Sequence, residues 1–213
     1  FEGVMGIAEA AVGFTGDLEN LKANGMSWLM GREGEKFTAA VSSLHGRTAA
    51  IIGLNKSLSA NASSLDYPMP DELLGANVEL YRTERFLNAL AKWLEREGEK
   101  RILVLFQNQS EIRPGGGFIG SYGDITMDGA GVKAIEVNDV YPADRELEKL
   151  VQIVPPAELR GITPLWGARD ANWFFHFPTS AEKAAKFLEA SPNYRREDVR
   201  FDAVIGMNVS VIE

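Results

Sequence analysis

The hydrophobic pattern of this chain changes its period near residue 102, and that change constrains the fold more than any other feature. Before it, apolar side chains recur at steps of three and four residues, the spacing of one helix face. The clearest such stripe consists of Phe37, Val41, Leu44, Thr48, Ile51, Asn55 and Leu58. After it, residues 102–106 form a short continuous apolar run, typical of a strand covered on both faces. The pattern predicts helices first and a sheet afterwards.

Residues 1–99 are predicted to form a helical region, either a hairpin or a bundle. An early helix is indicated by Leu18, Leu21, Trp28 and Leu29, and glycines within 31–34 can break it. The segment 61–70 is rich in Ser, Asn, Asp and Pro, which predicts a loop. Asp71 can then cap another helix that runs to about residue 98. The apolar stripes indicate that these helices pack against one another.

Residues 100–213 are predicted to form an α/β domain, with α+β as the alternative: a central sheet with helices packed on it, preceded by a helical hairpin. Strands are expected at 102–106, 118–127, 132–137 and 201–207, and residues 128–131 favour a hairpin turn. Thr179 can cap a helix that ends near Ala190. Residues 139–164 are predicted to be a long connection. A further helix is expected from Ser210, and the domain is expected to continue past Glu213.

Composition excludes several classes of function. The chain has 30 acidic and 22 basic residues, for a net charge of −8. This balance argues against a nucleic-acid surface, which needs concentrated Lys and Arg. The absence of cysteine excludes disulfides, thiolate catalysis and Cys-ligated zinc. Neither His45 nor His176 has zinc-site spacing, and no apolar run reaches the ~18 residues of a transmembrane helix.

A polar, glycine-rich segment follows the first predicted strand, where α/β sheets usually place ligand sites. Its three consecutive glycines let backbone amides approach an anion, and Arg113 beside them can bind phosphate with its planar guanidinium. A dinucleotide site is excluded because a strand, not a helix, is expected after the glycines. The alternative is a tight loop that needs positive φ, with Arg113 paired to an acidic neighbour. The ligand-binding candidates are Gln107, Asn108, Gly115, Gly116 and Gly117.

A second candidate segment places an Arg-Asp pair among aromatic residues. Arg169 can bind phosphate, while Asp170 can ligate a divalent cation or orient Arg169. Asn172 and Trp173, which follow directly, are further ligand-binding candidates. The alternative is a structural ion pair beneath an aromatic cluster that belongs to the core.

These segments resemble the bacterial family called domain of unknown function 4012. The motifs that carry the resemblance are LVLFQN at 103–108, EIRPGGGFIGSY at 111–122, RDANW at 169–173, FPTSA at 177–181 and FDAVIG at 201–206. They cover about residues 100–213, and the helical region before them also looks like that family. Members are usually envelope proteins with an upstream membrane helix, so the resemblance implies a membrane anchor before Phe1. It implies no established activity.

A looser resemblance concerns the order of strand, arginine loop, hairpin, Arg-Asp pair and helix, which is similar to the LytR-CpsA-Psr family. Those proteins transfer glycopolymers from a polyprenyl-pyrophosphate carrier to the cell wall. The resemblance implies a phosphotransferase on the extracytoplasmic face of the bacterial membrane, with Arg113, Arg169 and Asp170 as catalytic residues around the pyrophosphate. It also implies Mg²⁺ as a cofactor. Gly115 stands where that family carries an acidic residue, so the metal ligands stay unknown.

Two hypotheses of function follow. In the first, the chain is a membrane-associated envelope protein that handles glycopolymer or its polyprenyl-pyrophosphate carrier, with phosphotransfer as its reaction. In the second, it is a non-catalytic surface or scaffold protein that forms homo-oligomers through the helical stripe 37–58, and its glycines serve folding only. The first hypothesis requires both arginine heads to reach one anion. The second requires a helical stripe that is free to bind a partner.

Overall fold

A computed structural model describes residues 2–64, 71–208 and 210, and the side chains of 5–64, 77–208 and 210. The chain divides into two compact units. The first, which we call the three-helix unit, comprises residues 1–98 together with 128–132. The second, the α/β unit, comprises residues 99–127 and 133–213. Among the described residues, no helix combines the length and the apolar character needed to cross a bilayer.

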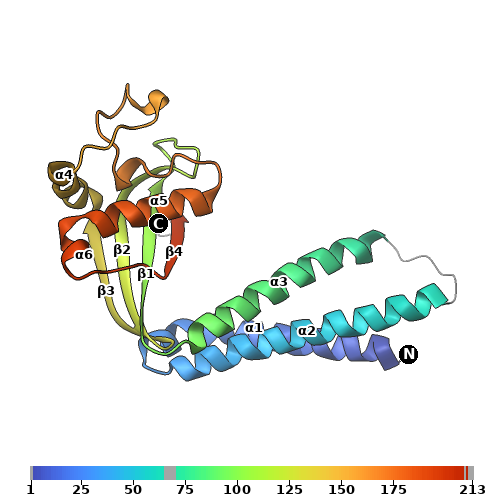
Figure 1. Ribbon diagram of the computed structural model, residues 1–213. Coiled ribbons are helices and arrows are strands. Elements are labelled where there is room, and N and C mark those ends of the chain that lie inside the picture. Colours follow the sequence, from blue (N-terminus) through green and yellow to red (C-terminus); the bar gives the residue numbers. More distant parts are fainter. Residues whose placement is uncertain (1, 65–70, 209, 211–213) are drawn as a thin grey trace. The chain divides into compact units, whose positions relative to one another are not determined.

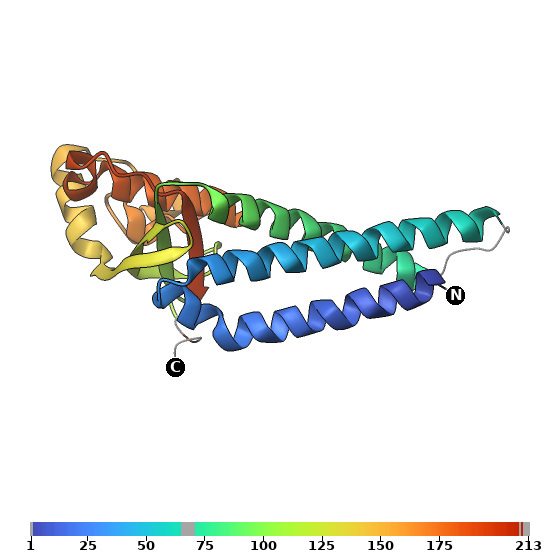
Figure 2. The same cartoon turned by 90° about the horizontal axis from the view of Figure 1, so that it is seen from below.

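The three-helix unit contains α1 (Glu2–Met30), α2 (Gly34–Ser64) and α3 (Asp71–Glu95). Helix α2 packs against both of the others, as Figures 1 and 2 show. The core of the three-helix unit consists of Val41, Leu44, Leu87, Ala91, Leu94 and Ala130, with Phe14, Leu18, Leu21, Phe37, Leu90 and Trp93 packed around them. The predicted stripe therefore faces the interior of this unit: Val41, Leu44, Thr48 and Ile51 are buried.

The boundaries of α2 differ in part from the prediction. The helix begins at the predicted glycine break, where the hairpin turn approaches closely: a Cβ on Gly34 would lie 2.5 Å from the carbonyl carbon of Ala130. It runs to Ser64, so the loop predicted at 61–70 was placed too early. The polar side chains that indicated a loop bond within the helix instead, since Ser64 Oγ donates to the Asn61 carbonyl at 2.6 Å. Residues 65–70 lie outside the described residues.

The α/β unit is built on a sheet of four strands in the order β3-β2-β1-β4. The strands are β1 (Glu99–Asn108), β2 (Phe118–Asp128), β3 (Gly131–Asp139) and β4 (Ala203–Asn208). Strands β1 and β4 are parallel, with a register from Ile102↔Ala203 to Gln107↔Asn208. The predicted α/β class is confirmed, because helices connect these parallel strands.

Helices α4 (Val140–Leu150), α5 (Phe177–Ala190) and α6 (Pro192–Arg196) pack on the sheet, and α5 crosses the strands in Figure 1. Short 3₁₀ turns, η1 (Ala157–Leu159) and η2 (Ala168–Asp170), lie in the connection between α4 and α5. One core joins these elements. It contains Leu103 and Leu105 of β1, Val140 and Leu147 of α4, Ala184 and Leu188 of α5, and Tyr194 of α6.

Helix α4 corrects the prediction of a long connection at 139–164. Asp139 caps the helix by accepting a hydrogen bond from the Tyr141 backbone N–H at 2.8 Å. Val140, Ala143 and Leu147 are buried at helical spacing. Helix α5 begins at Phe177, with proline in its first turn, so the predicted cap at Thr179 lies inside the helix. The helix predicted after Ser210 falls outside the described residues.

Candidate functional site

A cavity of about 420 Å³ opens on the α/β unit between the loop after β1, helix α4 and the η2 turn. Its volume is in the range of small-ligand pockets. Three of its lining residues are arginines, three are acidic, and the remaining walls are mostly apolar or aromatic. The lining residues are Glu111, Arg113, Phe118, Tyr141, Arg145, Glu148, Ile162, Thr163, Pro164, Arg169 and Asp170.

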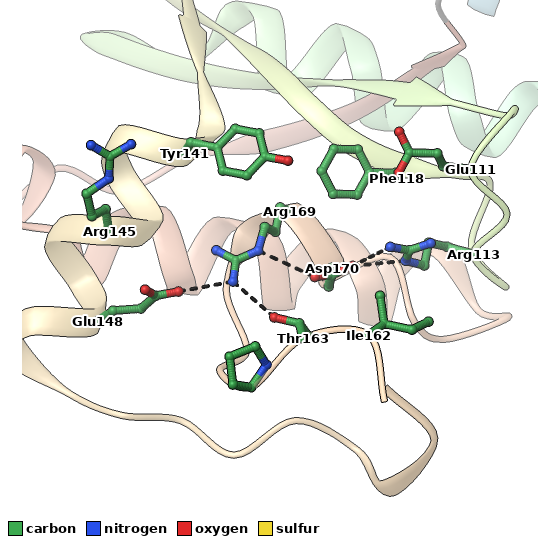
Figure 3. Close-up of a pocket in the computed structure, with 11 residues that line it drawn as sticks. Glu111, Arg113, Phe118, Tyr141, Arg145, Glu148, Ile162, Thr163, Arg169 and Asp170 are labelled. Carbon is green, nitrogen blue, oxygen red and sulfur yellow. Dashed lines mark hydrogen bonds and ion pairs between the residues drawn. The ribbon is translucent and has the colours of Figure 1, made fainter. Parts of the chain in front are cut away.

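The two predicted arginines meet at Asp170, which they approach from opposite sides in Figure 3. Arg113 donates from Nε at 2.9 Å and from Nη2 at 2.7 Å, both to Oδ1 of Asp170. Arg169 Nε lies 3.6 Å from the other oxygen, Oδ2. The three residues predicted to be catalytic are adjacent in space, although Arg113 and Asp170 are 57 positions apart along the chain. The Asp170 side chain is 2% exposed, so this pairing occurs largely out of water.

The convergence of these three residues is a tertiary feature. The sequence separation is 57 positions from Arg113 to Asp170 and, because Arg169 precedes Asp170 by one, 56 positions from Arg113 to Arg169. No local helix or turn can bring such distant positions together, so the loop after β1 and the η2 turn must be folded against each other. The predicted meeting of both guanidinium groups at one cavity is what the geometry shows.

Arg169 is held by a second buried carboxylate, which belongs to α4. Asp144 accepts from the backbone N–H groups of Ala168 at 2.6 Å and Arg169 at 3.2 Å, and from Arg169 Nη1 at 3.1 Å. A side chain on Gly167 would overlap the carboxyl group of Asp144, so only glycine allows this close approach. Asp144 therefore fixes both the η2 backbone and the direction of the Arg169 side chain.

Helix α4 also supplies pocket residues that the sequence did not reveal. Glu148 accepts from Arg169 Nη2 at 3.1 Å, and Thr163 Oγ1 accepts from the same nitrogen at 3.1 Å. Arg145, one helical turn before, lines the cavity, is exposed and has no ion pair within the described part of the chain. These residues were missed because 139–164 was predicted to be a connection. The spacing of Tyr141, Arg145 and Glu148 on one helix face was the available signal.

The three predicted glycines shape the loop and do not line this cavity. Gly116 and Gly117 have φ of 122° and 130°, values that favour glycine. The backbone N–H of Gly115 donates to the Asn172 carbonyl at 3.0 Å, and that of Gly116 donates to the Arg113 carbonyl at 3.1 Å. Because these two amides already have partners, the geometry agrees with the alternative prediction for this segment, a tight loop with Arg113 paired to an acid.

The remaining candidates are not among the residues that line the cavity. Asn172 is buried and donates from Nδ2 to the Gly117 carbonyl at 2.9 Å, which ties the two predicted segments together. Gln107 donates to the Gly115 carbonyl at 3.4 Å. Asn108 accepts from the Ser110 backbone N–H at 3.0 Å and so shapes the start of the loop. Trp173 is partly exposed and is not among the lining residues. The side chains of Gln107, Asn108 and Asn172 therefore hold the loop that carries Arg113.

Charge at the site is nearly balanced. Arg113, Arg145 and Arg169 face Glu111, Glu148 and Asp170, with Asp144 behind them. Burial raises the pKa of Asp144 above its usual range, although the backbone N–H groups of Ala168 and Arg169 oppose that effect. Burial acts to lower the pKa of Arg169, but the neighbouring carboxylates of Asp144 and Glu148 have the larger combined effect. The pKa of Arg169 is therefore raised above its usual value. Arg169 therefore remains a cation held in place by carboxylates.

The carboxylates of the site do not fit a metal centre. Both oxygens of Asp170 face guanidinium groups, and those of Asp144 face Arg169 and backbone N–H groups. Within the described residues, no group of three or more His, Cys, Asp or Glu side chains could hold a metal ion. A hard cation needs several free oxygen ligands, which this arrangement of ion pairs does not offer.

Comparison with known proteins assigns the α/β unit to a family. Residues 97–213 match the family model described as a protein of unknown function (DUF4012). The match covers more than half of the chain, and the chain belongs to this family. No curated protein and no solved structure matches it. The family predicted from the motifs is thus confirmed, and its name assigns no function.

Proposed function

We propose that this chain is an extracytoplasmic envelope protein that binds the pyrophosphate of a polyprenyl-linked glycopolymer in the Arg113–Asp170–Arg169 cavity. The observation that carries the proposal is the convergence of two arginines on one carboxylate, 2.7 Å from Arg113 and 3.6 Å from Arg169, inside one cavity. Guanidinium groups bind phosphoryl oxygens with a planar array of N–H donors. The apolar wall of Phe118, Ile162 and Pro164 suits the carrier beside its charged head.

The arginines divide into two kinds. The side chains of Arg113 and Arg169 are 9% and 14% exposed and already bound to carboxylates. Within the described residues, Arg113 uses Nε, Nη1 and Nη2 for one hydrogen bond each, which leaves two of its five N–H groups for a ligand. Arg145 is exposed and unpaired there, so its whole guanidinium can turn toward an anion. Arg145 would capture the ligand, and the buried pair would orient it.

Phosphotransfer is the reaction that this arrangement supports. A hydroxyl oxygen of the acceptor would attack the phosphorus that bears the glycan, and a new P–O bond would form. The bridging P–O bond would break, and the lipid phosphate would leave with its electron pair. Arg113 and Arg145 would stabilise the negative charge that develops on the departing phosphate. Asp170 would act as a positioning residue, because its oxygens face the two guanidinium groups.

Glu111 is the candidate acceptor of the proton from the attacking hydroxyl. It lines the cavity and is exposed, and its carboxylate accepts from Asn108 Nδ2 at 3.4 Å. Glu148 and Asp170, the other acidic lining residues, are paired with arginine. Because arginine holds those two carboxylates, Glu111 is the lining carboxylate that can turn toward a bound hydroxyl and accept its proton.

Binding of a soluble prenyl pyrophosphate tests the proposal. Titration calorimetry with geranyl pyrophosphate, with and without Mg²⁺, should detect saturable binding by the full chain. Arg145→Gln should weaken it by about fivefold to tenfold, because one charge-assisted hydrogen bond is lost at an exposed site. Substitution of Arg113 is less informative, because it would leave the buried Asp170 without its partner.

The matched control is Arg85→Gln, which removes an exposed arginine of α3 in the other unit. It should leave the affinity unchanged. No binding by the unsubstituted chain, or equal binding by the Arg145 and Arg85 variants, would refute the proposed site.

The scaffold hypothesis requires a different binding surface from the predicted stripe 37–58. The stripe 37–58 faces the interior of the three-helix unit at four of its positions, so it is not a free surface there. Helices α1 and α3 instead expose large apolar side chains, namely Met5, Val12, Met26, Met30, Val78, Tyr81 and Phe86. If assembly is the function, sedimentation should show concentration-dependent multimers that substitution of these side chains abolishes. A monomer at all concentrations would argue against this second proposal.

A further inference from the structure

The loops around the cavity expose large apolar side chains to solvent. Phe175 and Ile112, at 91% and 86%, are the two most exposed large hydrophobic residues in the described part of the chain. Ile162 and Val154 are 67% and 64% exposed. We call Ile112, Val154, Ile162 and Phe175 the apolar rim. Single exposed apolar residues are ordinary, and what sets these four apart is that their loops belong to or are bonded to segments of the cavity.

Hydrogen bonds join the loops that carry the apolar rim. The Gly115 backbone N–H donates to the Asn172 carbonyl at 3.0 Å, which links the loop of Ile112 to that of Phe175. The Trp166 backbone N–H donates to the Ile153 carbonyl at 2.8 Å, which links the loop of Val154 to the segment before η2. Ile162 itself lines the cavity beside Arg113 (Figure 3). Ile162 of the apolar rim therefore lies at the cavity, Ile112 lies between the lining residues Glu111 and Arg113, and the loops of Phe175 and Val154 are bonded to segments of the same site.

We propose that the apolar rim inserts into the surface of a lipid bilayer, so that the cavity opens toward the lipid headgroups. This inference deepens the proposed function and rests on it, because a membrane-bound carrier must reach the cavity from the bilayer. The rim consists of four exposed side chains on separate loops. Such side chains can each enter the fluid interface between headgroups and acyl chains, and each buried one adds apolar area.

Charge at this end predicts how the bilayer is bound. Two exposed arginines lie near the apolar rim, Arg145 on α4 and Arg160 after η1. The exposed carboxylates of Glu111 and Glu158 balance their charge. The net charge of the chain is −8. Attraction to anionic lipid therefore cannot dominate, and apolar insertion must supply most of the binding. Raising the salt concentration should change vesicle binding by less than about twofold, whereas binding through a cationic patch would fall steeply.

Vesicle sedimentation tests this inference with the full chain. Vesicles of phosphatidylethanolamine and phosphatidylglycerol, without any pyrophosphate lipid, should bind the protein. The double substitution Ile112→Ser with Phe175→Ser should lower the partition coefficient by at least about tenfold, because two large apolar side chains no longer enter the interface. The matched control is Phe86→Ser with Val137→Thr, since these residues are 64% and 66% exposed at other surfaces. The control should bind vesicles like the unsubstituted chain.

A second measurement uses the absence of cysteine in the sequence. Phe175→Cys, labelled with an environment-sensitive fluorophore, should shift to shorter wavelength on vesicles, whereas labelled Phe86→Cys should not. The inference would be overturned if the protein did not bind vesicles and the fluorophore showed no shift. Equal losses of binding in the rim and control variants would also overturn it. Loss of a dimer, without vesicle binding, would assign the rim to a second copy instead. The rim variant should keep geranyl pyrophosphate binding in solution, so failure of the membrane contact can be told from failure of the proposed site.

Discussion

The two units of the chain differ in what they bury. In the described residues the core of the three-helix unit is apolar apart from Thr48, and its Arg47–Asp17 ion pair has side chains that are 39% and 25% exposed. The α/β unit buries Asp124, Asp144 and Asp170, with arginine beside each carboxylate. Buried charges destabilise a fold unless they are paired, so the stability of the fold does not by itself require them. The comparison places the buried charges of the described residues, and with them the candidate site, in the α/β unit.

Removal of one carboxylate from each unit should give the largest difference in stability loss between the units. Asp170→Asn should destabilise the α/β unit by about 3 kcal/mol, because two guanidinium groups would lose their shared charge partner in a buried site. Asp17→Asn should cost the three-helix unit at most about 1 kcal/mol, since the pair is near the surface. Hydrogen exchange followed by mass spectrometry reports on each unit separately. Equal losses in the two units would break the comparison.

Two glycine substitutions should sharpen this comparison of the units, because they are expected to change the free energy of unfolding in opposite directions. Gly167→Ala should destabilise the α/β unit by about 1–3 kcal/mol, because the added Cβ would overlap the Asp144 carboxyl group. Gly53→Ala should stabilise helix α2 by about 0.5–1 kcal/mol, because no neighbouring atom lies within 4 Å of the added Cβ and alanine favours a helix. Both changes can be measured by urea unfolding. A stabilised Gly167 variant would show that Asp144 is not held as tightly as its contacts indicate.

The smallest expected effects concern pH. Burial raises the pKa of Asp124, whose stabilising contribution is therefore present below about pH 4 and lost as the pH rises through its folded-state pKa. The Ser43 hydroxyl and Arg47 lower the pKa of Asp17, so its contribution is present above about pH 4 and lost as the pH falls. At neutral pH, Asp124→Asn should stabilise the chain by about 1 kcal/mol and Asp17→Asn should destabilise it by less than about 1 kcal/mol.

The check is the unfolding free energy of both variants across the acid range. The gain at Asp124 should disappear toward pH 3, and so should the loss at Asp17. If the two variants change stability in the same direction at neutral pH, the proposed difference between Asp124 and Asp17 is wrong.

The sequence was sufficient to predict most of the secondary structure, because buried apolar residues recur with the period of the helix or strand that carries them. The stripe that includes Val41, Leu44 and Ile51 predicted a helix with one covered face, and these residues are buried on α2. The run 102–106 predicted a central strand, and β1 lies between β2 and β4. Helix α4 was missed although its buried residues have helical spacing, since its charged residues and nearby prolines were interpreted as a connection. That error removed Asp144 and Glu148 from the predicted site.

The sequence by itself determined the family, the helical and sheet regions, and the two segments that carry Arg113 and Arg169, because these depend on local patterns of residue type. Only the tertiary structure decided that both arginines share Asp170, that Asp144 and Glu148 hold Arg169, and that three glycines shape a loop without lining the cavity. Ion pairing between distant segments depends on how helices and loops are placed on the sheet. Hydrophobic periodicity records which side of an element is buried, and it does not record which charged side chain will lie opposite another.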